Sequence, residues 1–267
     1  MKLDGSKILL TGASSGIGAA LAPILAERGA TVGIVARRAN RLEEVLELCR
    51  KHSPESQMWA VDLSDLDAAE KVALAAWETF GGYDAVIHNA AIPKRVFVPR
   101  LTMADMSETM NVNFDSPVRM TLAVLPKMLE RKSGTIVWVS SMGGRIPIAN
   151  EAAYNAAKYA MCGFAEAMYL DIAGSGVDVK LIMPGPIDTE IWDIPGNEPA
   201  LMDIEKVPPA DCAAGIADAL EDDGFEYYVP PVYPGGIGAK DLAVAKVQDC
   251  DNYLRGMADM ARAMRTE

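Results

Sequence analysis

A glycine-rich turn near the start of the chain separates a short apolar run from a helix-forming stretch. Residues 7–10 (KILL) are followed directly by TGASSGIG at 11–18, and then by an Ala- and Leu-rich stretch that ends near residue 28. Three glycines so placed let the backbone turn tightly, approach a pyrophosphate and pack the helix close to the strand. The start of the helix would offer free N–H groups to phosphates. The segment therefore predicts a dinucleotide site, with a purely structural turn as the alternative.

Strand-like and helix-like segments alternate along the rest of the chain. The predicted strands are 7–11, 31–35, 57–61, 84–88, 134–140, 178–183 and 226–229, and the predicted helices are 16–28, 39–52, 66–80, 102–112, 114–131, 152–173 and 209–220. Such alternation indicates a parallel sheet with helices on both faces, with ligands at the carboxyl ends of the strands. We expect an α/β protein in which residues 1–267 form one domain, a doubly wound parallel sheet of the Rossmann type.

Tyr154 and Lys158 are four residues apart in the run EAAYNAAKYA, which contains neither Gly nor Pro and reads as helix. The spacing places both side chains on one face. A neighbouring ammonium favours the phenolate and so lowers the Tyr pKa from its usual value of about 10. The pair is a candidate device for moving a proton to or from an alcohol or a carbonyl. A solvated surface pair is the alternative.

Together these motifs resemble the short-chain dehydrogenase/reductase family, over roughly residues 5–230 and in the family order. The matching segments are TGASSGIG at 11–18, Asp62-Leu63 in VDLSD, Asn89 in HNAA at 88–91, Asn113 in MNVNF, Ser141 thirteen positions before Tyr154, and PGPIDT at 184–189. His88 and Ala91 depart from the family pattern, where Asn and Gly stand. We expect these departures to affect packing near the cofactor and to leave the chemistry intact.

The resemblance implies an oxidoreductase and assigns roles to individual residues. Tyr154 would be the general acid in reduction and the general base in oxidation, and Lys158 would lower its pKa and hold the nicotinamide ribose. Ser141 would hydrogen-bond the substrate oxygen, and Asn113 would position a water that relays protons to Lys158. The implied cofactor residues are Gly12, Ser14, Ser15, Gly16, Ile17, Gly18, Asp62, Leu63, Asn89, Tyr154, Lys158, Pro184, Gly185, Ile187 and Thr189.

Two arginines at the end of the second predicted strand indicate which dinucleotide binds. An NAD-preferring fold places an acid there to bind the ribose 2′-hydroxyl, but this stretch reads VARR and has no carboxylate. Arg37 can clamp a 2′-phosphate in a bidentate manner, and Arg38 is expected to assist. NADP(H) is therefore the predicted cofactor. A solvated side chain is the alternative reading, more for Arg38 than for Arg37.

Substrate recognition is expected to fall on the segment 190–207, which resembles the family's substrate lid. Its apolar residues between prolines are Ile191, Trp192, Ile194, Leu201, Met202 and Ile204. An apolar, mobile lid favours a hydrophobic ketone or alcohol. Lys94, Arg95 and Arg145 would favour an acidic group instead, if they are not simply solvated.

Residues 232–267 extend beyond the family pattern and are predicted to be helical. Apolar residues there follow an alternating four–three spacing: Ala243, Val247, Cys250, Leu254, Met257, Ala261 and Met264. Such a seam would pack on the chain's own domain or on a partner subunit. The family also implies a homodimer or homotetramer, formed by the two long helices that carry Met128, Leu129, Met161, Cys162 and Phe164.

Composition narrows the class of partner. The chain has 25 basic and 37 acidic residues, a net charge of −12, which argues against nucleic acid or an anionic membrane. No apolar run approaches the roughly 18 residues of a membrane span, and no signal peptide is recognisable. Four scattered cysteines read as reduced thiols of a cytoplasmic protein, and with two histidines no metal site is expected.

The function predicted from the sequence is thus NADP(H)-dependent interconversion of a carbonyl and a secondary alcohol on a small, apolar substrate. Two alternatives remain open. One is an NAD-dependent alcohol dehydrogenase of the steroid or sugar type. The other is a catalytically idle NADP(H)-binding protein, although such proteins commonly lose the Ser, Tyr or Lys that are all present here.

Overall fold

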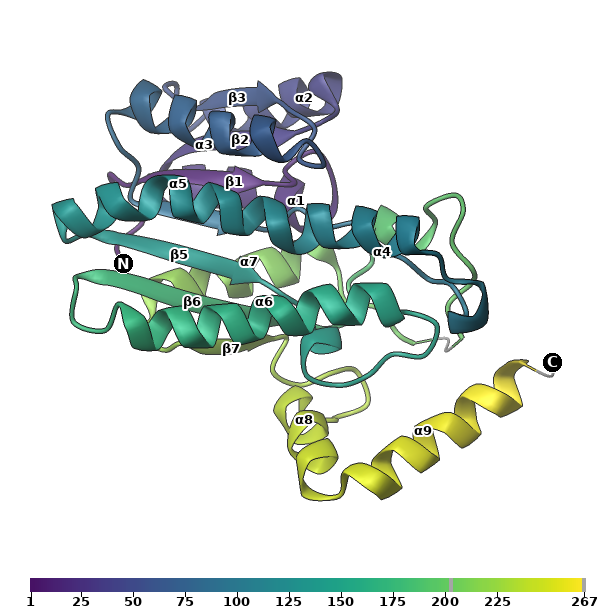
Figure 1. Ribbon diagram of the computed structural model, residues 1–267. Coiled ribbons are helices and arrows are strands. Elements are labelled where there is room, and N and C mark those ends of the chain that lie inside the picture. Colours follow the sequence, from purple (N-terminus) through teal and green to yellow (C-terminus); the bar gives the residue numbers. More distant parts are fainter. Residues whose placement is uncertain (202–203, 266–267) are drawn as a thin grey trace.

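In the computed structural model, which describes residues 1–201 and 204–265, seven strands form one parallel sheet (Figure 1). The strands are β1 (Lys7–Thr11), β2 (Thr31–Ala36), β3 (Gln57–Ala60), β4 (Ala85–His88), β5 (Gly134–Val139), β6 (Val177–Pro184) and β7 (Glu226–Val229). Their order across the sheet is β3-β2-β1-β4-β5-β6-β7. The chain runs outward from β1 to one edge and then from β4 to the other, so the order reverses between β1 and β4. This reversal is where a doubly wound sheet opens a crevice for ligand, and the predicted fold class is confirmed.

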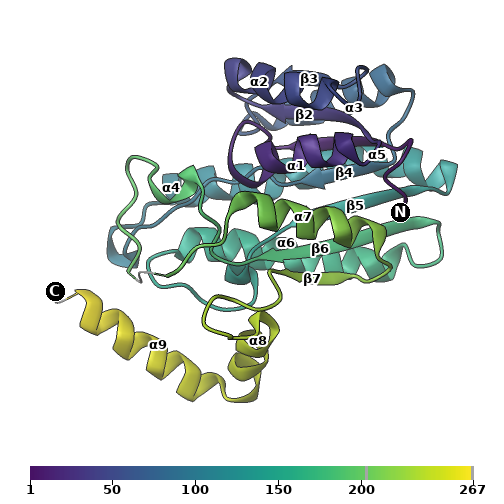
Figure 2. The same ribbon diagram turned by 180° about the vertical axis from the view of Figure 1, so that it is seen from behind.

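Helices cover both faces of the sheet (Figures 1 and 2). One face carries α1 (Gly16–Glu27), α2 (Ala39–Arg50) and α7 (Pro209–Glu221), and the other carries α3 (Leu66–Phe80), α5 (Ser116–Arg131) and α6 (Ala152–Asp171). The strands are buried on both sides, as the fully inaccessible run Ile8, Leu9 and Leu10 shows. Near-continuous apolar strands of this kind are expected only where helices cover both faces.

Short elements at the carboxyl edge of the sheet complete the fold there. They are α4 (Met103–Met110), the 3₁₀ turns Val98–Arg100, Met142–Gly144 and Glu190–Trp192, and a π-helical turn at Asn111–Asp115. Thr102 and Asp105 form a reciprocal capping box that starts α4. The π-helical turn joins α4 to α5 without a break, whereas the sequence predicted two separate helices. Single π turns of this sort are often found at functional sites.

The C-terminal segment folds as two helices rather than as one continuous seam. They are α8 (Ala239–Gln248) and α9 (Cys250–Arg265), interrupted at Asp249, whose backbone is not helical. Because the break changes the direction of the chain, the predicted seam is wrong: the Val247 side chain is 78% exposed and Leu254 is 44% exposed. In Figures 1 and 2, α9 runs from the foot of α8 back toward the α4 end of the sheet.

The two long helices bury most of the residues that were expected to face a partner subunit. Met128, Met161 and Cys162 are at most 1% exposed and pack in the protein's own core. They are therefore not available to a second copy of the chain. No helix formed by the described residues is long and apolar enough to cross a bilayer.

Candidate active site

A cavity of about 1190 Å³ opens at the carboxyl edge of the sheet. It brings together most of the residues that the sequence singled out. These are Gly12, Ser14, Ser15, Gly16, Ile17, Arg37, Arg38, Asp62, Leu63, Asn89, Ser141, Tyr154, Lys158, Pro184, Gly185, Ile187 and Thr189. Gly18 and Asn113 lie behind this wall and support it through contacts with their neighbours.

The glycine turn after β1 is shaped by close approaches of backbone. Gly12 has a φ of 72°, and a Cβ there would lie 2.7 Å from the Cα of Ala90. A Cβ on Gly18 would lie 2.4 Å from the carbonyl oxygen of Gly12. The Ser15 side chain does not cap α1, so N–H groups of the first turn of that helix are open to an anion. The turn therefore fits a dinucleotide pyrophosphate.

Arg38, rather than Arg37, lies against the glycine turn. Its guanidinium donates to the Ser15 Oγ at 2.7 Å and to the Ser14 Oγ at 3.3 Å, and it pairs with Glu190 at 2.8 Å. The Arg37 side chain is 65% exposed and reaches only Asp62, at 3.7 Å. This geometry reverses the order expected from the sequence, because the end of β2 directs the second arginine toward the turn and leaves the first in solvent.

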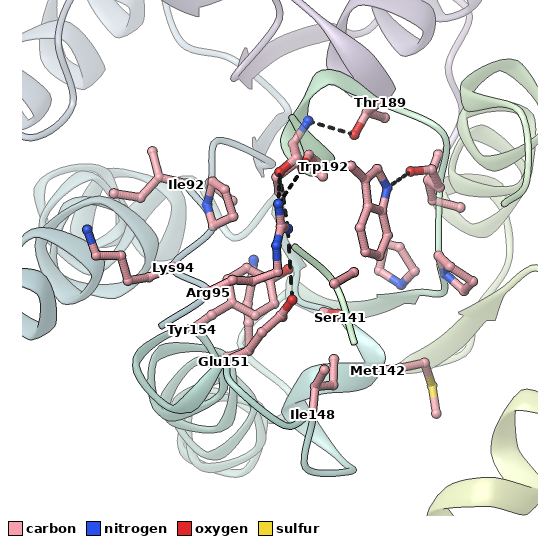
Figure 3. A pocket seen from close by; sticks show the side chains of 18 of the residues that line it. Ile92, Lys94, Arg95, Ser141, Met142, Ile148, Glu151, Tyr154, Thr189 and Trp192 are labelled. Carbon is pink, nitrogen blue, oxygen red and sulfur yellow. Dashed lines mark hydrogen bonds and ion pairs between the residues drawn. The ribbon is translucent and has the colours of Figure 1, made fainter. Parts of the chain in front are cut away.

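Ser141, Tyr154 and Lys158 line the same cavity. Figure 3 shows the first two among the residues of its wall. Ser141 follows β5, and its Oγ accepts a hydrogen bond from Gly143 N at 3.0 Å. Lys158 is 1% exposed, and its Nζ donates to the Val139 carbonyl at 2.9 Å and lies 5.6 Å from the Tyr154 ring centroid. Burial lowers the pKa of Lys158 to about 8.

The pKa of Tyr154 is raised above its usual value, which contradicts the expectation that Lys158 lowers it. Burial is the main cause, since it disfavours the phenolate. The hydrogen bond with Ser141 acts in the opposite direction, and the nearby Glu151 carboxylate raises the pKa further. Tyr154 therefore holds its proton in this structure, as a general acid must before it donates.

Asn113 lies within the π-helical turn and is fully buried. Its side-chain Oδ1 accepts from Ile92 N at 2.8 Å, and its Nδ2 donates to the Ile92 carbonyl at 2.9 Å. The amide thus fastens the loop after β4 to the start of α5.

Residues 6–196 match the family model described as short chain dehydrogenase. The chain is a short-chain dehydrogenase. The 3-oxoacyl-(acyl-carrier-protein) reductase FabG of Vibrio cholerae is 31% identical over 223 residues, which cover 81% of this chain and 90% of that protein. A dehydrogenase/reductase SDR family protein 7-like of Anopheles gambiae is 33% identical and covers 87% of this chain and 77% of its own.

The fold of this short-chain dehydrogenase is shared with solved structures. A short-chain dehydrogenase from Burkholderia cenocepacia, solved in complex with NADP, covers 96% of this chain and 99% of its own with a TM-score of 0.78 at 24% identity. A second structure, from Streptomyces avermitilis, has a TM-score of 0.79 at 25% identity and covers 97% of this chain and 98% of its own.

Arg95 fastens the substrate-lid segment of this dehydrogenase to the body of the protein, a role that the sequence did not reveal (Figure 3). The side chain is 3% exposed. Its guanidinium donates to the main-chain carbonyls of Ile191, Trp192 and Glu198 and lies 5.5 Å from the Trp192 ring centroid. These partners are all within the lid segment, so one buried cation bonds three main-chain carbonyls of the loop, in addition to the ion pairs of Glu190 and Glu198 at the surface.

Glu151 balances the charge of Arg95 at a distance of 3.9 Å and is itself 8% exposed. Burial raises the pKa of this carboxyl to about 7, and the attraction of Arg95 only partly opposes that rise. Glu151 lies three residues before Tyr154 and lines the cavity. No local pattern in the sequence distinguishes this glutamate from a surface residue.

The other two basic residues near the site are neither solvated nor free for a substrate. Lys94 pairs with Asp105 at 2.5 Å, and Arg145 pairs with Glu226 at 2.8 Å and also with Glu166. The reading of Lys94, Arg95 and Arg145 as simply solvated charges is therefore wrong, and their alternative part in binding an acidic group stays a prediction. The apolar lid residues Ile191, Trp192, Ile194, Leu201 and Ile204 do line the cavity, and Met202 lies outside the described residues.

His88, which departs from the family pattern, faces the core rather than the cavity. It is 2% exposed, its Nε2 lies 2.8 Å from the Thr121 Oγ1, and its ring centroid is 4.9 Å from that of Trp138. Burial lowers its pKa to about 3, so the imidazole is neutral at physiological pH. The substitution is accommodated by packing between β4 and α5.

Proposed function

We propose that this short-chain dehydrogenase interconverts a carbonyl and a secondary alcohol on an apolar small molecule, with NADP(H) as the cofactor and Tyr154 as the general acid and base. The observation that carries the proposal is the meeting of Ser141, Tyr154 and Lys158 on the wall of the cavity that also contains the glycine turn. One cavity then holds the cofactor and presents the substrate oxygen to the phenol. Bound NADP(H) would supply or accept the hydride.

The side chains have complementary parts in this chemistry. In reduction, the Tyr154 phenol, which is protonated at neutral pH, donates its proton to the substrate oxygen. Burial opposes this step because it raises the pKa of the phenol, so a charge that stabilises the phenolate is needed. The Ser141 hydroxyl donates a hydrogen bond to the same oxygen as negative charge develops on it. Lys158, with a pKa of about 8, remains largely protonated near pH 7 and stabilises a phenolate once the proton has left.

Two observations support NADP(H) rather than NAD(H). No carboxylate stands at the end of β2, where an acid would bind the free ribose hydroxyl. Arg38 is fixed at the glycine turn by Ser14 and Ser15, beside the expected position of the adenosine ribose, and a bound 2′-phosphate would take the place of its present partner Glu190. Two structural neighbours, from Burkholderia cenocepacia and Sphingobium yanoikuyae, were solved with NADP and NADPH.

The test is oxidation of NADPH and of NADH in the presence of a panel of ketones, aldehydes and keto acids, with three proteins in parallel. The wild type should consume NADPH, and Tyr154→Phe should lose about 10² to 10⁴ in kcat/KM, the usual contribution of a positioned acid. Tyr159→Phe is the matched control, because Tyr159 lies on the same helix and its hydroxyl bonds the exposed Lys246 instead.

Three results would contradict parts of the proposal. Equal losses in the two Tyr variants would remove Tyr154 from the chemistry. A preference for NADH would favour the NAD-dependent alcohol dehydrogenase. Binding of NADPH without turnover of any member of the panel would favour an idle nucleotide-binding protein.

A further inference from the structure

Helix α9 forms the outer wall of the cavity, although it lies beyond residue 196, where the match to the family model ends. Its contribution is one face of the helix, made of Tyr253, Met257, Met260 and Met264, the small residues Gly256 and Ala261, and the polar Asn252 in the first turn. Met260 is 42% exposed and Met264 is 38% exposed. A row of half-exposed methionines that borders a cavity is an apolar surface without a protein partner in the described chain.

Helix α9 is capped locally at its start and is bonded to the body of the protein at its end. At its start, the Asp249 carboxylate accepts from Asn252 N at 3.2 Å and from the Asn252 side chain at 2.6 Å. At its end, the Arg265 guanidinium donates to the Asn150 Oδ1 at 2.7 Å and lies 4.1 Å from the Phe97 ring centroid. Between the ends only Ala261 is buried. The helix therefore spans the cavity and leaves the methionines facing it.

The same cavity is also lined by the apolar side chains of Ile148 and of the lid residues Trp192, Ile194 and Ile204. Lys206 lies over the Trp192 ring, 5.1 Å from its centroid, and is not among the described lining residues. The nearby cations Lys94 and Arg95 are paired with Asp105 and Glu151, and the exposed carboxylate of Glu108 would repel an anion. A substrate carboxylate or phosphate would thus meet, among the described lining residues near the lid, cations that already have carboxylate partners, whereas a hydrocarbon chain would contact apolar side chains of both the lid and α9.

We propose that α9 is part of the substrate site, and that the substrate is an elongated, uncharged apolar ketone or alcohol. The inference rests on the proposed function, which puts the substrate oxygen at Tyr154 and Ser141. The apolar tail then lies between the lid and the methionine face of α9. Methionine suits this position because its unbranched thioether adapts to chains of different shape.

The experiment is a series of methyl ketones from hexanone to decanone, measured both as kcat/KM and as calorimetric binding to the Tyr154→Phe protein. Each buried methylene should strengthen binding and kcat/KM by up to about fourfold in the wild-type site. The double variant Met260→Gln/Met264→Gln keeps the side-chain length but adds two polar amides. In this variant the factor by which each methylene raises affinity and kcat/KM should fall from about fourfold toward one. Leu254→Gln is the matched control, because Leu254 lies on α9 outside the cavity wall.

The outcomes separate this inference from the function on which it rests. A flat series in both readouts would overturn the elongated apolar substrate. An unchanged slope in the double methionine variant, or an equal loss in Leu254→Gln, would overturn the part assigned to α9. A rising affinity without turnover of any ketone would refute the proposed reaction and still support the apolar site.

Discussion

Replacement of Arg95 by methionine should release the lid segment and destabilise the protein. The Arg95 guanidinium bonds three main-chain carbonyls and faces the buried Glu151. Three bonds from a charged donor, at about 1.5–3 kcal/mol each, would sum to roughly 5–9 kcal/mol. The freed carbonyls belong to a surface loop and can regain water, so we expect about 3–5 kcal/mol, the usual cost of removing one partner of a buried ion pair.

The pH dependence of this loss can be worked out from Glu151. Burial already raises its folded-state pKa from 4.5 to about 7, and loss of the Arg95 charge should raise it further. Below about pH 7 the Glu151 carboxyl is protonated in both the folded wild type and the folded variant. As pH rises from the ordinary carboxyl pKa of 4.5 toward 7, the carboxyl ionises only in the unfolded state, so both proteins lose stability by the same amount. Above that pH the wild-type Glu151 gives up the proton and the variant retains it, so the extra cost in the variant develops there.

The assay is urea denaturation followed by circular dichroism at several pH values, together with the KM for the best ketone, which should rise as the lid loosens. Arg100→Met is the matched control, because Arg100 bonds the Glu198 carboxylate but its side chain is 63% exposed. We expect that exposed pair to contribute less than about 1 kcal/mol. Equal losses in the two variants, or a loss below 1 kcal/mol in Arg95→Met, would refute the account of Arg95 as the residue that holds the lid.

Two further predictions concern other residues of the site. Arg38→Ala should raise the KM for NADPH by about tenfold to a hundredfold, the effect of one charge-assisted hydrogen bond, and leave the KM for NADH nearly unchanged. A larger effect in Arg37→Ala would show that Arg37 is the main ligand of the 2′-phosphate, as the sequence predicted. Burial lowers the pKa of Lys158 from 10.5 to about 8, so its charged form costs stability below pH 8 and the cost fades as pH rises through that window. Below pH 8, Lys158→Met should therefore have a larger free energy of unfolding than the wild type, and this difference should shrink as pH rises toward 10.5. A difference that does not change with pH would show that the buried charge of Lys158 is not what lowers the stability of the wild type.

The sheet and the catalytic cluster were predictable because their signals are local. The apolar run 7–10, the glycines of 11–18 and the four-residue spacing of Tyr154 and Lys158 each depend on a few neighbouring residues. Periodicity and turn chemistry then determine the elements, and the parallel order of the strands brings their carboxyl ends together. Helix and strand ends differed from the prediction by up to two residues where tertiary contacts set the boundary, as at the π-helical turn.

The features that were missed depend on which side chains become buried together. Arg95 reads as a surface residue until the lid is seen to supply three carbonyls for its guanidinium. The direction of Arg38 is set by the last residues of β2, and the break at Asp249 turns a predicted seam into the outer wall of the cavity. The pKa of Tyr154 also follows from burial, which no spacing of residues reveals.

The two ends of the chain differ in what a fusion to them would disturb. The N-terminal ammonium donates to the Leu220 carbonyl at 2.7 Å, at the edge of the sheet away from the cavity (Figure 1). Helix α9 ends with Arg265 on Asn150 and Phe97, next to the substrate entrance. An affinity tag or reporter joined after α9 would therefore begin beside the cavity wall that Met264 lines and compete with substrate for space, whereas one joined before Met1 would disturb the part-buried bond to Leu220, away from the cavity.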